Sequence, residues 1–157
     1  MIPTIGEYSY LPIERVHFGQ GSIAKLRTEL DKLGSARPYV ITGQTIANKT
    51  DLVSRLEKSA GRKLAGTFSE IRQHAPETGI RNAAMAAAKA RADVLISLGG
   101  GSPIDATKIV VKELSENFRE APLPHVAVPT TLSAAEFSHS AGMTDEKLKR
   151  KTGVRDI

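Results

Sequence analysis

Three consecutive glycines stand where a buried strand is expected to run into a helix. The stretch "DVLISLGGGSPIDATKIV" covers residues 93–110, and its apolar first half is followed by Gly99, Gly100 and Gly101. Glycine has no side chain to keep a ligand from the backbone, so this turn suits a phosphate group held by N–H groups. An ordinary tight turn is the alternative, and three glycines in a row favour the phosphate site.

The helix that follows has residues suited to its first turn. Ser102 is expected at the N-cap, Pro103 at the first helical position and Asp105 at the third, a variant of the capping box. The unpaired N–H groups and the positive end of the helix dipole would attract a pyrophosphate. Lys108, about one turn further on, either adds charge to this site or pairs with Asp105.

Common nucleotide motifs do not match this loop. It lacks the last glycine of G-x-G-x-x-G, and no Gly-Lys-Ser/Thr follows as in a Walker loop. The ribose-binding acid of the ordinary fingerprint, about twenty residues on, would be Glu120. Glu120 lies in an expected loop and is better explained as a solvated charge.

Expected strands and helices alternate along the chain and would position the glycine loop. Compact apolar runs predict strands within 14–22, 38–42, 63–68, 93–98 and 125–129, and helical periodicity predicts helices at 23–33, 52–60, 76–92 and 102–118. This order predicts an α/β fold, a Rossmann-like, mostly parallel sheet flanked by helices. After residue 129 the pattern weakens, so 130–157 is expected to be a weakly structured end.

Composition limits the classes of function. The 157 residues are 40% hydrophobic and 25% charged, which fits one globular domain with a real core. The net charge of +5 is concentrated near the end, and aromatic residues are only 4%, so nucleic-acid binding is not expected. No apolar run predicts a membrane span or secretion signal, and the absence of cysteine fits the cytoplasm.

Several motifs together resemble one known family. "GGGSPIDATK" is similar to the GGGS-x-x-D-x-x-K signature of iron-containing (group III) alcohol dehydrogenases, and "VPTTLSAAEFS" resembles the Pro-Thr-Thr segment that follows it there. The opening "VHFGQGSIAKLRTELDKLG" also looks like that family. The spacing of Glu136 after the two threonines is closest to the maleylacetate-reductase-like branch.

The resemblance implies an oxidoreductase whose N-terminal half binds NAD or NADP. The pyrophosphate would lie on the glycine loop and Ser102, with Thr130 and Thr131 along the nicotinamide side. Two β-branched residues ending a strand would explain these threonines equally well. Ala134 and Ala135 replace small or hydroxyl residues of many relatives, which puts hydroxyl contacts there in doubt.

Gly43 is the residue expected to bear on the choice of cofactor. Relatives that prefer NAD often carry an acid after the second strand, and the matching place here, after "PYVIT", is Gly43. With no carboxylate to repel a 2′-phosphate, NADP is expected to be tolerated. A plain strand-to-helix turn is the alternative explanation of this glycine.

The expected catalytic half is missing from this chain. In the family, an aspartate and three histidines that bind a divalent metal (Fe or Zn) lie mostly in a C-terminal helical domain, which is absent here. The four histidines show neither H-x-x-x-H nor H-E-x-x-H spacing: His17, His74, His125 and His139. We therefore predict no metal site and no catalytic residue, and a chain inactive alone.

The whole chain, 1–157, is thus expected to be the NAD(P)-binding N-terminal domain of a truncated enzyme. Its reaction would be hydride transfer between the cofactor and an alcohol, aldehyde or maleylacetate-like substrate. Expected partners are the cofactor, that small molecule, the missing helical domain and further copies in a homo-oligomer. A freestanding nucleotide-binding module and a dehydroquinate-synthase-like fragment are the alternatives.

Overall fold

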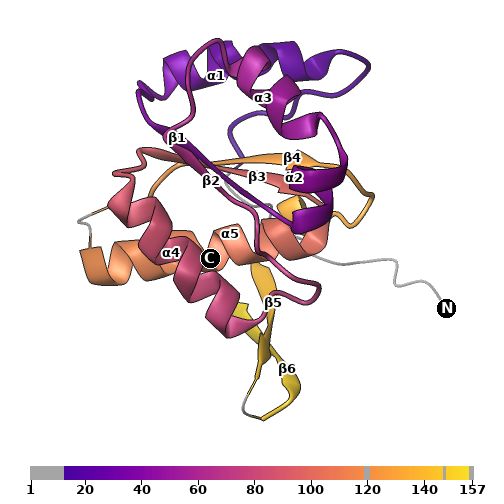
Figure 1. The fold of residues 1–157 in the computed structure, drawn as a ribbon, viewed down its shortest axis with the longest axis vertical. Helices are drawn as coiled ribbons and strands as arrows, with labels where there is room; N and C mark the ends of the chain where they lie inside the picture. The colour runs from indigo at the N-terminus through magenta and orange to yellow at the C-terminus, as the bar shows by residue number, and fades with distance from the viewer. Residues whose placement is uncertain (1–12, 119–120, 147, 156–157) are drawn as a thin grey trace, which may run out of the picture.

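A four-stranded parallel sheet forms the centre of the molecule (Figure 1). The computed structural model describes residues 13–118, 121–146 and 148–155. Along the sheet the order is β2-β1-β3-β4, and all three neighbouring pairs are parallel. The strands are β1 Pro38–Thr42, β2 Gly66–Phe68, β3 Val94–Gly99 and β4 His125–Pro129. The predicted α/β class and mostly parallel sheet are confirmed.

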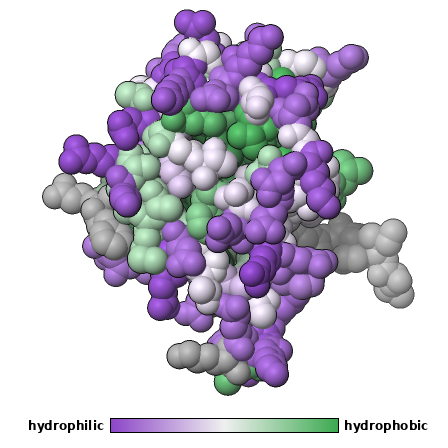
Figure 2. All heavy atoms as spheres, in the orientation of Figure 1, coloured by the Kyte–Doolittle hydropathy of each residue, from purple (hydrophilic) through white to green (hydrophobic). Residues whose placement is uncertain are grey.

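Helices cover both faces of this sheet. One face carries η1 Ser22–Lys25, α1 Leu26–Lys32 and α3 Leu52–Ala60, and the other carries α4 Glu77–Lys89 and α5 Gly101–Phe118. A short α2, Gln44–Lys49, follows β1. Figure 2 shows apolar residues gathered in the middle of this view, with hydrophilic residues above and below them. The molecule is therefore a three-layer sandwich with two apolar clusters.

The middle strand β3 separates these two clusters. All six of its residues are buried, as expected for a strand covered on both faces. Leu95 belongs to the cluster under α4 and α5, whereas Ile96 and Leu98 belong to the cluster under α1 and α3. This alternation follows from the two-residue period of a strand.

The end of the chain is more ordered than its sequence predicts. After η2, Ala135–Phe137, an antiparallel hairpin forms from β5 Ser140–Asp145 and β6 Arg150–Arg155. Ala141 is buried, and Met143 and Val154 pack against the α4/α5 cluster. The weak structure expected for 130–157 is wrong for this part, because a one-sided hairpin needs few apolar residues.

The strand expected within 14–22 is also wrong. Residues 13–17 have no regular structure, and the next segment enters η1. Val16 is 53% exposed and Phe18 is 91% exposed. A strand needs a hydrogen-bonding partner, and no described strand pairs with this segment.

Candidate functional site

The strand order reverses between β1 and β3, and in open α/β sheets such a switch point places a crevice outside the carboxyl ends of the two strands. The connection from β1 runs through α3 on one face, whereas the connection from β3 runs through α5 on the other. The ends of the two strands are adjacent, because Thr42 pairs with Leu98 and its Oγ1 donates to the Leu98 carbonyl at 2.6 Å. In open α/β sheets, ligands bind at this kind of switch point, outside the carboxyl ends of the strands.

All four predicted glycines lie at this edge. Gly43 follows β1, and residues 99–101 end β3 and begin α5. A Cβ on Gly43 would stand 3.0 Å from the Ile71 carbonyl oxygen, so a close backbone approach accounts for this glycine.

Packing also explains two of the three glycines in the loop. Gly99 has φ +149°, and a Cβ there would lie 2.7 Å from Pro103 Cγ. A Cβ on Gly100 would lie 3.0 Å from Thr131 Oγ1, so the neighbouring threonine already fills that space. At Gly101 the nearest atom would be Ser133 Cβ, at an ordinary 3.4 Å. Only at Gly101 does the protein itself leave room for a methyl group.

The first turn of α5 differs from the predicted capping box. The helix begins at Gly101, and Ser102 lies inside its first turn. Ser102 Oγ accepts the backbone N–H of His74 at 3.0 Å, and Asp105 Oδ2 accepts the backbone N–H of Gly142 at 3.0 Å. The predicted cap is therefore wrong, because partners distant in sequence take both side chains. The helix-start N–H groups come from Gly101 and Ser102, since Pro103 has none.

Lys108 is a buried cation directed at backbone carbonyls. Its Nζ donates to the carbonyls of Ala135, Ser138 and Ser140 at 2.6, 2.7 and 3.1 Å, and the residue is only 8% exposed. Burial lowers the pKa of Lys108, against the opposing effects of Asp105 and Glu136. An ammonium has three N–H donors, so this arrangement leaves none for a phosphate.

Asp105 completes this tether between α5 and the end of the chain. Burial raises the pKa of its carboxyl group, and the Gly142 N–H and the nearby Lys108 and Lys151 act against that rise. Through Asp105 and Lys108, one face of α5 holds both η2 and β5.

The two predicted threonines follow the neighbouring strand at the same edge. Thr130 N–H donates to the Gly99 carbonyl at 2.9 Å, and Thr131 lies against Gly100. Both threonines are exposed. The structure thus brings the glycine loop, Gly43 and these threonines to one edge of the sheet.

Sequence reasoning missed the segment after β2, which crosses this edge. Ile71 N–H donates to the Thr42 carbonyl at 3.2 Å, and the chain then reaches Ser102 through His74. His74 and Ala75 have φ values of 64° and 45°, which are uncommon for residues with a Cβ. Thr144 of β5 donates through Oγ1 to the His74 carbonyl and through N–H to the Ala75 carbonyl. No local sequence signal announces these long-range bonds.

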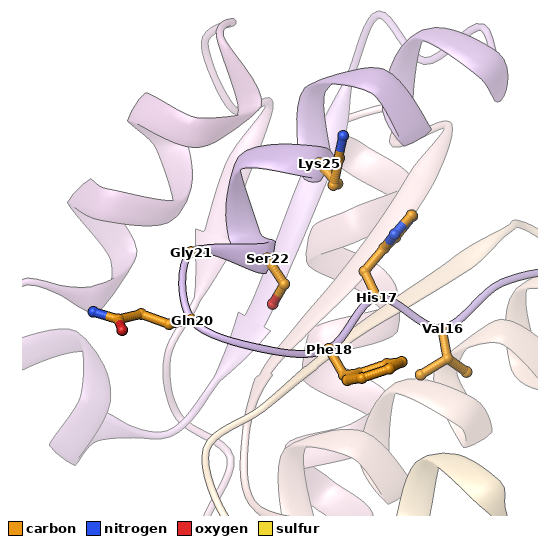
Figure 3. Close-up of a pocket in the computed structure, with 7 residues that line it drawn as sticks. All are labelled: Val16, His17, Phe18, Gln20, Gly21, Ser22 and Lys25. Atoms are coloured by element: carbon orange, nitrogen blue, oxygen red, sulfur yellow. The ribbon is translucent and has the colours of Figure 1, made fainter.

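Two hollows in the described part of the chain differ in their position relative to this edge. The larger, about 380 Å³, lies at the start of η1 (Figure 3), and its lining residues are Val16, His17, Phe18, Gln20, Gly21, Ser22 and Lys25. It contains none of the predicted cofactor residues. The smaller, about 140 Å³, includes Gln44 directly after Gly43 and therefore adjoins the crevice.

A family model for iron-containing alcohol dehydrogenases matches residues 13–157, which is nearly all of the chain. The chain belongs to the iron-containing alcohol dehydrogenase family. Its similarity to maleylacetate reductase 2 of Cupriavidus pinatubonensis is 33% identity over 136 residues, covering 87% of this chain and 35% of that protein. With the maleylacetate reductase of Sphingobium indicum it shares 31% identity over 142 residues, covering 90% and 37%.

Solved structures share the fold of this chain. The maleylacetate reductase of Agrobacterium tumefaciens aligns with TM-score 0.78 and 28% identity, over 96% of this chain and 40% of that one. A sulfoacetaldehyde reductase of Bifidobacterium kashiwanohense in complex with NAD+ aligns with TM-score 0.84 at 18% identity, over 98% and 44%. The chain spans little more than a third of the length of the curated relatives it matches.

The family is named for its iron, which raises the question of whether side chains in the described part of the chain are grouped to bind a metal ion. Within 13–118, 121–146 and 148–155, no three His, Cys, Asp or Glu side chains are grouped to hold an ion. His125 Nε2 lies 2.8 Å from Ser97 Oγ between β3 and β4. Burial lowers the pKa of His125 to about 4, so its ring is neutral at pH 7. None of the described helices is long and apolar enough to cross a bilayer.

Proposed function

We propose that residues 1–157 form the dinucleotide-binding domain of an oxidoreductase and bind NAD or NADP at the crevice between β1 and β3. The observation that carries this proposal is the meeting of Gly43, the glycine loop and the start of α5 at one switch point. The fold of the NAD+-bound sulfoacetaldehyde reductase supports the same assignment. Crevices at such switch points bind nucleotides in many α/β proteins.

Each part of this edge has a role in the proposed complex. The N–H groups of Gly101 and Ser102, at the positive end of α5, would hold the pyrophosphate. Thr130 and Thr131 would lie along the nicotinamide side. Asp105 and Lys108, predicted as cofactor residues, are bonded to 135–142, so in the proposed complex they would support the start of α5 and not contact the cofactor directly. The bound nicotinamide would supply or accept a hydride.

The substrate class follows from the relatives. Several curated relatives at 30–33% identity are maleylacetate reductases, so we propose hydride transfer to maleylacetate or to a similar carbonyl compound, with alcohols and aldehydes as the wider class. Residues corresponding to the part of the relatives that this chain does not cover would bind the divalent Fe or Zn ion and would supply the catalytic groups. The chain alone is then expected to bind cofactor without turnover.

The proposal is tested at Gly101. Gly101→Ala adds a methyl group that the structure accommodates beside Ser133, on a residue whose N–H is proposed to hold the pyrophosphate. We expect NADH and NADPH to bind at least about tenfold more weakly in calorimetric titration, because one charge-assisted contact is worth that much. Gly100 is a poorer choice, since its replacement would also displace Thr131.

A matched control is available in the hairpin. A Cβ on Gly153 of β6 would meet no atom within 4 Å, so Gly153→Ala adds the same methyl group in the hairpin and not in the glycine loop. It should bind both cofactors like the unmodified chain. Equal affinities of the Gly101→Ala and Gly153→Ala variants would remove the glycine loop from the site.

A further inference from the structure

A polar hollow of about 140 Å³ adjoins the proposed cofactor crevice on the side of β2. Gln44 comes from the start of α2, Glu70 and Arg72 from the segment after β2, and Asn82 from α4. Thr78 and Glu146 close its far side. These groups come from four separate elements, so the tertiary fold assembles the hollow.

The backbone fixes where this hollow lies. Ile71 N–H donates to the Thr42 carbonyl at 3.2 Å, and the Ile71 carbonyl oxygen is 3.0 Å from the Cβ position of Gly43. Glu70 and Arg72, on either side of Ile71, are thereby brought beside the end of β1. In nucleotide-binding sheets, the adenosine ribose lies beside the end of the strand next to the one that carries the phosphate-binding turn. In this chain the turn follows β3, so that neighbouring strand is β1.

The charges of the hollow are not equally available. The Glu146 carboxylate accepts the N–H of Thr78 at 3.1 Å and also its hydroxyl, at the first turn of α4. These bonds, with the nearby Arg72, lower the pKa of Glu146. Glu146 is thus engaged at the helix start, which leaves Arg72 and Glu70 as the opposite charges of the hollow.

We propose that this hollow is the subsite for the adenosine ribose, where Arg72 binds the 2′-phosphate of NADP and Glu70 binds the ribose hydroxyls of NAD. This inference rests on the proposed function and adds the residues that choose the cofactor. A guanidinium binds phosphate with paired hydrogen bonds, and a carboxylate accepts from a diol but repels a phosphate of charge about −1.5 to −2. Gly43 has no charged side chain, so the choice between NAD and NADP is assigned to Arg72 and Glu70.

The experiment measures the dissociation constants of NADH and NADPH for three variants of the purified chain by calorimetry. Arg72→Gln should reduce the preference for NADPH over NADH about tenfold, the effect of losing one charge-assisted contact. Glu70→Gln should change the same ratio in the opposite direction, because it removes the repulsion of the phosphate and a partner of the diol.

Arg81→Gln is the matched control. Arg81 lies on α4 and pairs with Glu77 at 2.8 Å on the surface, outside the hollow. Its substitution therefore removes the same charge as Arg72→Gln but leaves the proposed subsite intact. The control should keep the NADPH to NADH ratio. An unchanged ratio in both Arg72→Gln and Glu70→Gln, or a ratio that moves as much in Arg81→Gln, would overturn the inference. Failure of the unmodified chain to bind either cofactor would instead overturn the proposed function.

Discussion

Two turns at the carboxyl edge of the sheet hold unusual backbone conformations by opposite means. The turn after β3 places its positive φ at Gly99, where the absence of a Cβ makes the conformation inexpensive. The segment after β2 places positive φ values at His74 and Ala75, which carry a Cβ. Hydrogen bonds from Ser102 and Thr144 hold that second segment. One turn is thus specified by its own residue type, and the other by its neighbours.

The largest effect is expected from placing a side chain in the first turn. Gly99→Ala combines a strained φ with a Cβ at 2.7 Å from the ring of Pro103, which cannot rotate away. The free energy of unfolding should fall by about 2–4 kcal/mol, measured by urea denaturation. A loss as small as that of Gly153→Ala would mean that the turn relaxes easily, and the contrast between the two turns would disappear.

A smaller loss is expected when the support of the first turn is removed. Thr131 packs on Gly100, and the chain after it is held by the three hydrogen bonds of Lys108. Lys108→Met keeps the length of the side chain but leaves three carbonyls without this donor. We expect a loss of about 2–3 kcal/mol in unfolding free energy, together with weaker NADH binding through misplacement of the loop.

Lys108→Arg provides the second measurement for that prediction. It restores a cation with several donors, so it should recover part of the stability and of the NADH affinity. Full stability and affinity in the methionine variant would show that the first turn needs no support from Lys108.

The smallest effect, a gain in stability, is expected in the second turn. His74→Gly removes the Cβ from a residue at φ 64° while keeping the backbone N–H to Ser102, so unfolding free energy should rise by about 0.5 kcal/mol. Arg91→Gly, at φ 50° after α4, is the matched comparison and should gain a similar amount. A clear loss of stability in His74→Gly alone would mean that the imidazole itself supports the second turn.

These turns also explain which parts of the fold could be predicted. Dense apolar runs predicted β1 and β3, because strands covered on both faces have few polar positions, and helical periodicity predicted α5. Positive φ at Gly34 and Gly61 agrees with the predicted ends of α1 and α3. Local residue types carry this information, so one sequence is enough to find it.

The remainder depends on contacts between distant residues. Asp105 suggested a helix cap, but its carboxylate bonds to Gly142, 37 residues away. Lys108 suggested a phosphate ligand, but its donors meet carbonyls 27 to 32 residues away. Glu70 and Arg72 gave no signal, because only the crossing of 71–75 over β1 brings them to the crevice.

The hairpin of β5 and β6 has a consequence for local unfolding. Through Gly142 it bonds to Asp105 of α5, through Thr144 to the turn at His74 and Ala75, and through Glu146 to the first turn of α4. Because β5 and the residue directly after it make all three connections, we expect them to open cooperatively, and the amide hydrogens of Gly142, Thr144 and Thr78 are expected to exchange with solvent at similar rates. A binding event that protects one of these amides would therefore protect the other two.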